Sequence, residues 1–187
     1  MTSSEWKNLV VFTHDFVKNE KNLSIKDEKV RDISDKLPRA DLDILNTLQS
    51  DCRMTLAELS EQVNLSQTPC WRRWKKLEND GYIAGYNAVL DRKKLGLSVI
   101  GFSQIRLNSH HPEDTTKFEL AIKEFDWVLL CFCITGEADF IVQIIAKDLD
   151  QYYERVSELR RLPYVWSIQS SIAIKEVKST HQIPVRS

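Results

Sequence analysis

The sequence lacks the features that mark several large classes of protein. No stretch approaches the run of roughly 18 apolar residues that a membrane-spanning helix needs. The first residues do not combine a basic start with an apolar run, so we predict no secretory signal peptide. The 26 basic and 27 acidic side chains give a formal net charge of −1, which indicates no particular class of partner.

Motifs for catalysis and metal binding are also absent from the sequence. The four cysteines do not have zinc-finger spacing, and none of the four histidines falls inside a predicted core element. There is no phosphate-binding glycine loop, nucleophile elbow or metal triad. We therefore expect no catalytic residue, metal site, cofactor or membrane partner in a chain long enough for two small domains.

Three helical patterns lie in the first half of the chain. Ala40, Ile44 and Leu48 repeat every fourth residue and predict a helix over residues 38–50. Thr55 and Glu58 have the spacing of a capping box and predict the start of a second helix. A turn over residues 64–67 then leads to a third, which makes a helix-turn-helix.

The third helix has the layout of a DNA recognition helix. We predict Thr68 as its N-cap and Pro69 as its first residue, and Cys70, Trp74 and Leu77 then form one apolar stripe. No acidic residue lies between Gln62 and Leu77, so positive charge is concentrated on the opposite face. The predicted DNA-binding residues are Ser66, Gln67, Thr68, Arg72, Arg73, Lys75 and Lys76. Among them Arg72 is the best candidate for reading guanine. The alternative to the DNA-binding prediction is that these charges form a solvated helix face that binds no DNA.

The second half of the chain has a different pattern. After Gly81, aromatic and branched residues predict a strand or extended connector, either a wing or a hinge. Beyond it the predicted order is strand 99–107, helix 115–125, strand 127–135, strand 139–146, a helix from Asp148 to Pro163, and strand 164–174. This β-α-β-β-α-β order predicts a ferredoxin-like α+β sandwich with both helices on one sheet face. Residues 129–134 are apolar on both faces, so we expect a second copy of the chain to cover the other face.

These patterns divide the chain into five segments. We predict an N-terminal extension over residues 1–37, which is charge-rich with few large apolar residues in its later part. The helix-turn-helix then occupies residues 38–84, a connector residues 85–96, the α+β domain residues 97–178 and a tail residues 179–187.

From about residue 38 to residue 184 the chain resembles the leucine-responsive/asparagine-operon (Lrp/AsnC) transcription regulators. The motifs that carry the resemblance include Asp41-x-x-Ile44-Leu45, Leu65-Ser66-x-Thr68-Pro69-Cys70, Gly81-x-Ile83-x-Gly85-Tyr86, Thr135-Gly136-x-x-Asp139 and Leu162-Pro163. The resemblance implies a winged helix-turn-helix followed by a RAM domain. It also implies a homodimer built through the RAM sheets, in some members a tetramer or octamer, that binds promoter DNA. Such a regulator is expected to be cytoplasmic, nucleoid-associated and of prokaryotic type.

The resemblance also implies an effector site for an amino acid or related metabolite between RAM domains. The matching positions are Gly136, Glu137, Ala138 and Asp139, together with Ser171 and Ile172 on the last strand. A turn glycine frees backbone amides for a carboxylate, and an aspartate can pair with an α-ammonium group. Alternatively, Gly136 only permits the turn and Asp139 only caps it.

Three residues depart from the family pattern, and two other functions stay open. Trp74 replaces a small aliphatic residue, and Trp71 beside the apolar stripe either packs against the first helix or approaches the DNA backbone. Tyr164 stands where a glycine commonly follows Leu-Pro, which puts that turn in doubt. One alternative function is a DNA-architectural protein of the same family with little sequence preference. The other is an enzyme similar to the siroheme decarboxylases, which share the two-domain fold.

Overall fold

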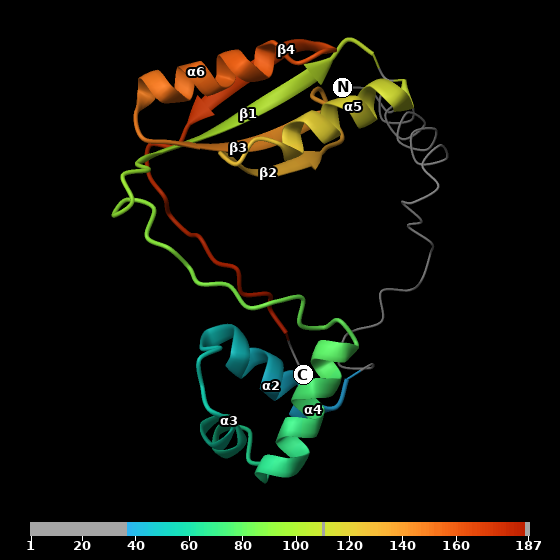
Figure 1. Cartoon of the computed structure of the whole chain (residues 1–187), viewed down its shortest axis with the longest axis vertical. Helices are drawn as coiled ribbons and strands as arrows, with labels where there is room; N and C mark the ends of the chain where they lie inside the picture. Colours follow the sequence, from blue (N-terminus) through green and yellow to red (C-terminus); the bar gives the residue numbers. More distant parts are fainter. Residues whose placement is uncertain (1–36, 110, 186–187) are drawn as a thin grey trace, which may run out of the picture. The chain divides into compact units, whose positions relative to one another are not determined.

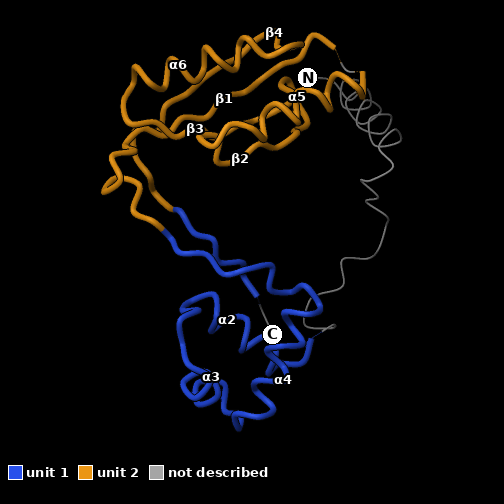
Figure 2. The backbone as a smooth tube through the Cα atoms, viewed as in Figure 1, with its two compact units in different colours: residues 1–89, 179–187 blue, residues 90–178 orange. Residues whose placement is uncertain are grey.

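The computed structural model describes residues 37–109 and 111–185, which belong to two compact units (Figure 2). Unit 1 contains the described residues up to Val89 together with those from Ser179 onward, and unit 2 spans residues 90–178. The predicted N-terminal extension lies outside the described residues, except for Leu37. Within the described ranges, no helix has both the length and the apolar character to cross a membrane.

The described part of unit 1 contains three helices, α2 (Arg39–Ser50), α3 (Leu56–Gln62) and α4 (Gln67–Asn79) (Figure 1). The capping box of α3 is confirmed, because the Thr55 side chain accepts from the Glu58 amide and the Glu58 carboxylate accepts from the Thr55 amide. The predicted start of α4 is wrong: Ser66, not Thr68, is the N-cap. Pro69 is then the third residue of α4, where an amide would still have no partner within the helix.

One apolar core joins the three helices of unit 1. It consists of Ile44, Leu45, Leu48, Leu59, Val63, Cys70 and Leu77. Trp74 is only partly buried against this core, so the indole is accommodated at its edge. In the described part of unit 1, residues 82–89 form no strand, so they are an extended connector and not a wing strand.

Unit 2 is an antiparallel four-stranded sheet of order β2-β3-β1-β4 with two helices on one face (Figure 1). Its elements are β1 (Val99–Leu107), α5 (Pro112–Lys123), β2 (Val128–Cys133), β3 (Phe140–Ala146), α6 (Leu149–Arg160) and β4 (Val165–Ile172). The predicted β-α-β-β-α-β order is confirmed. Helix α5 begins three residues earlier than predicted, because Pro112 takes the first helical position after the N-cap residue His111.

The two faces of the sheet have different surroundings. The helix-covered face is fully buried at Ile105, Val142 and Ile144. On the other face, which we call the open face, Phe102 and Phe132 are 38% and 61% exposed. Alternate residues of a strand point to opposite faces, so this difference follows from the pattern of the sequence.

Tyr164 adopts a backbone conformation that favours glycine. Its φ is 71°, in the left-handed region that costs a non-glycine residue about 1 kcal/mol or more. The Tyr164 carbonyl accepts a hydrogen bond from the Asn108 amide at 2.8 Å, and the ammonium group of Lys117 lies 5.6 Å from the ring centroid. These contacts hold the tyrosine in the turn.

An ion pair joins the first and third helices of unit 1. Arg73 Nη1 lies 2.9 Å from Oδ1 of Asp41, and the Asp41 side chain is only 8% exposed. A carboxylate buried to that extent needs a compensating charge or hydrogen bonds, because water no longer solvates it. The pair therefore helps to set how α4 lies against α2.

We predict that Arg73→Ala destabilises unit 1 by about 1–3 kcal/mol, because it leaves the buried Asp41 carboxylate without its cation. Urea unfolding followed by tryptophan fluorescence measures the loss. Arg72→Ala is the matched control, since Arg72 is exposed on the same helix and its removal should change stability by less than about 0.5 kcal/mol. Equal stabilities for the two variants would contradict a structural role for the ion pair.

Candidate functional site

The N-terminal turn of α4 presents polar side chains to solvent. Ser66, Gln67 and Thr68 are all exposed, as the DNA-binding prediction requires. The first backbone amides of a helix also lack partners within it, and they carry partial positive charge. This end of α4 can therefore donate hydrogen bonds to phosphate oxygens as well as offer side chains to base edges.

The four predicted basic residues of α4 fall into two pairs with different surroundings. Arg72 and Lys76 are exposed, and no ion pair engages either of them among the described residues. Arg73 is engaged by Asp41, as described above, and Lys75 lies 2.6 Å from the Glu78 carboxylate. Arg72 and Lys76 are therefore the cations of α4 that are available to an outside anion.

Glu78 and Tyr86 form a hydrogen-bonded network with Trp74 that the sequence did not predict. The indole N–H of Trp74 donates to the Tyr86 hydroxyl at 2.6 Å, and that hydroxyl donates to Glu78 at 2.9 Å. The hydrogen bonds from Lys75 and Tyr86 lower the pKa of the Glu78 carboxyl, which stays ionised. The network ties the beginning of the connector to α4. The Gly85-Tyr86 motif marked the position of Tyr86, although it did not show the partners.

The predicted effector turn connects β2 to β3. Gly136 has a φ of 124°, which L side chains rarely adopt, so glycine is required for the shape of the turn. Ala138 is buried, whereas the Glu137 carboxylate is exposed and lies 3.2 Å from the guanidinium of Arg106. Arg106 also donates to the Glu137 carbonyl. Arg106, which the sequence did not single out, therefore holds the turn from β1.

Asp139 has a structural role in this turn. One carboxylate oxygen accepts from the Leu107 amide at 2.7 Å, and the Asp139 amide donates to the Ile105 carbonyl at 2.9 Å. Both contacts lie at the end of β1. These two hydrogen bonds support the alternative prediction for Asp139, in which it stabilises the turn.

The two groups of predicted effector residues do not meet within one subunit. Ser171 pairs with Phe102 and Ile172 with Gly101, whereas the turn contacts β1 at Ile105 and Leu107. A strand rises about 3.4 Å per residue, so the groups lie on the order of 10 Å or more apart along β1. Neighbouring strand residues also face opposite sides, so Ser171 lies on the open face and Ile172 does not. A single site that uses both groups requires two subunits.

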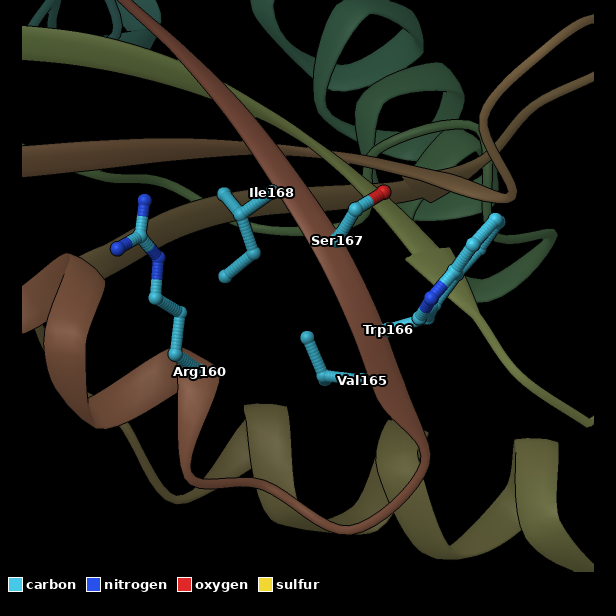
Figure 3. Close-up of a pocket in the computed structure, with 5 residues that line it drawn as sticks. All are labelled: Arg160, Val165, Trp166, Ser167 and Ile168. Atoms are coloured by element: carbon cyan, nitrogen blue, oxygen red, sulfur yellow. The ribbon is translucent and has the colours of Figure 1, made fainter.

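Two hollows in unit 2 contain none of the six predicted effector residues. One lies between the end of α6 and β4 and is lined by Arg160, Val165, Trp166, Ser167 and Ile168. Figure 3 shows Val165 and Ile168 on the Arg160 side of the strand, with Trp166 on the other side. The second hollow lies between α5 and β2 and includes Phe125, Leu129 and Cys131. The residues that line these two hollows are therefore not those of the predicted effector site.

Comparisons with known proteins match both units of the chain. A family model described as "Winged helix-turn-helix DNA-binding" matches residues 37–84, and one described as "Lrp/AsnC ligand binding domain" matches residues 100–183. The chain is 34% identical over 152 residues to the DNA-binding transcriptional activator DecR of Escherichia coli, covering 80% of this chain and 99% of DecR. It is also 34% identical over 151 residues to the E. coli leucine-responsive regulatory protein, covering 80% and 92% of the two chains.

Solved structures give the same result. An AsnC family regulator from Agrobacterium tumefaciens has a TM-score of 0.77 at 32% identity, covering 79% of this chain and 97% of the other. The regulator NMB0573 of Neisseria meningitidis, solved as a complex with L-Met, has a TM-score of 0.76 at 34% identity, covering 79% and 96%. With a DNA-binding helix-turn-helix before a four-stranded ligand-binding domain, and with relatives matched over nearly their whole length, the chain belongs to the Lrp/AsnC family of transcription regulators.

Proposed function

We propose that this regulator binds specific promoter sequences with α4 in the major groove. The observation that carries the proposal is the surface of α4, where an exposed polar N-terminal turn continues into exposed Arg72 and Lys76, opposite the buried Cys70 and Leu77. A helix of this kind fits the major groove, with its first residues nearest the base edges.

We assign different roles to the predicted DNA-binding residues. Gln67, Thr68 and Arg72 read base edges, with the Arg72 guanidinium donating two hydrogen bonds to one guanine. Ser66 and Lys76 contact phosphates, which position the helix without reading sequence. Arg73 and Lys75 act mainly within the protein, through Asp41 and Glu78, and they support the geometry of α4.

We further propose that DNA binding or assembly responds to an amino acid or a related metabolite. The site is the turn from Gly136 to Asp139, completed by Ser171 and Ile172 of another subunit. The family match of unit 2 and the L-Met ligand of the Neisseria relative support this assignment. Arg106, on β1 beside the turn, can pair with the carboxylate of an amino acid, and the Asp139 carboxylate can pair with its α-ammonium group.

The open face of the sheet supports a homodimer. Phe132 pairs with Ile141 and Phe102 with Gln143, so the two phenylalanines lie on adjacent rows of one surface. A second copy of the chain would bury this apolar surface, and a sheet packed face to face with another sheet is a common solution. Larger assemblies of such dimers, tetramers or octamers, belong to the same proposal, and the protein would act in the cytoplasm on the nucleoid.

Arg72→Ala should lower affinity for the promoter duplex by about 10-fold to 100-fold, because it removes a guanine contact worth about 1–3 kcal/mol. Affinity for a scrambled duplex should fall much less. Fluorescence anisotropy at a fixed salt concentration measures both. Lys123→Ala, an exposed substitution on α5, is the charge-matched control. An equal loss on both duplexes would instead support the architectural role.

Asp139→Asn should weaken effector binding about tenfold or more, because it removes the charge that pairs with an α-ammonium group. The amide oxygen of asparagine can still accept from the Leu107 amide, so the turn should persist. Calorimetric titration of free amino acids, starting with L-methionine, tests this. Undiminished affinity in the variant would leave Asp139 with its structural role alone.

Phe132→Glu should weaken the dimer at least about tenfold, because it places a charge in the proposed interface. Sedimentation velocity over a range of concentrations measures the shift toward monomer. Leu120→Glu is the control, since Leu120 is 57% exposed on α5, away from the open face. Dimers of equal strength in both variants would rule out an interface at Phe132.

A further inference from the structure

The C-terminal segment of the chain is hydrogen-bonded to α2. The side-chain amide of Gln49 contacts the backbone of Ile183 twice, accepting from its N–H at 2.6 Å and donating to its carbonyl at 3.1 Å. Asn46 donates to the Val185 carbonyl at 3.1 Å, and the side chain of Gln182 donates to the Gln49 carbonyl at 3.3 Å. Four hydrogen bonds thus join residues that are more than 130 positions apart.

The geometry of these contacts is that of a site that reads an extended backbone. Gln49 pairs with both polar groups of one residue, as a neighbouring strand would. Asn46 and Gln49 are three residues apart and therefore lie on one face of the helix. Ile183 and Val185 are two residues apart on an extended segment, so their carbonyls point to the same side, toward that face. Pro184 between them restricts Ile183 to extended conformations and lowers the entropy lost on docking.

The segment also changes how the units are connected. The chain leaves unit 1 after Val89, forms unit 2, and returns to unit 1 from Ser179 onward (Figure 2). The units therefore have two connections as long as the segment stays docked on α2: the covalent connector after Val89, and the returning segment, which hydrogen bonds hold to α2. When it is undocked, the connector after Val89 is the one remaining attachment.

We propose that the Asn46 and Gln49 face of α2 is a docking site for an extended peptide, that the chain's own C-terminal segment Gln182–Val185 occupies it, and that the effector response of DNA binding requires this docking. The last step rests on the proposed function. Neither Asn46 nor Gln49 belongs to the DNA-contacting set on α4. Undocking therefore leaves DNA affinity without effector unchanged and removes the effect of the ligand on it.

Hydrogen exchange of the Ile183 amide in the full chain tests the docking directly. The hydrogen bond that this amide donates to the Gln49 side chain should slow exchange about tenfold relative to the free peptide of residues 179–187. Gln49→Ala should return the amide to the rate of the peptide. Ser50→Ala is the control, because among the described residues the Ser50 hydroxyl donates to the carbonyl of Asn46 in its own helix. Exchange at the peptide rate in the unmodified protein overturns the proposal.

A disulfide trap identifies which copy supplies the segment. Asn46→Cys with Val185→Cys leaves the Gln49 contacts in place, and Cys52→Ser and Cys133→Ser remove two exposed native thiols. An oxidised product that runs as a monomer on a non-reducing gel supports docking within one chain. A crosslinked dimer overturns that assignment.

The effect on regulation is measured as promoter affinity with and without a mixture of the common amino acids. The unmodified protein should show a shift, and Gln49→Ala or a chain ending at His181 should keep the affinity without amino acids while losing most of the shift. An equal shift in the variants overturns the regulatory step. If amino acids do not change the promoter affinity of the unmodified protein, the proposed effector response is refuted instead. Hydrogen exchange of the Ile183 amide then still tests the docking.

Discussion

The apolar stripe of α4 constrains every other side chain of that helix. Cys70 and Leu77 are buried in the core of unit 1, which fixes the rotation of the helix about its axis. With that rotation set, Arg72 and Lys76 can only point to solvent, and Arg73 lies at the border where it reaches Asp41. The basic surface is therefore as well defined as the core that opposes it, and a helix held in this way presents its side chains to DNA with little loss of conformational freedom.

Strand β1 has a comparable role in unit 2. It pairs with both β3 and β4, and its end holds the Gly136 turn through Arg106 and Leu107. Close packing also acts here, because a Cβ atom at Gly101 would lie 2.2 Å from the Tyr152 ring. The turn proposed to hold the effector is thus attached to a central strand of the sheet. A ligand bound there would act on a rigid element rather than on a free loop.

Helices and strands with a strong apolar period were predictable from the sequence, as was the local capping box of Thr55 and Glu58, whereas polar contacts between separate elements were not. The spacing of Ala40, Ile44 and Leu48 placed α2 to within one residue, and β1 was predicted with the correct bounds. The start of α4 was missed, since Ser66 and Thr68 are both good N-cap residues and Pro69 fits either choice. Arg73 and Asp41 are 32 positions apart, and Tyr86 lies outside the helix that carries Glu78, so no rule for residues within one helix indicates either contact.

The return of the chain to α2 has a consequence for how the protein is made. Synthesis proceeds from the N-terminus, so α2, α3 and α4 leave the ribosome first and can bury their shared core at once, because no residue of the C-terminal segment belongs to it. The hydrogen-bonding groups of Asn46 and Gln49 must wait for Ile183 and Val185, which are translated more than 130 residues later. A nascent chain can therefore bury the core of its helix-turn-helix before α2 acquires these hydrogen-bond partners.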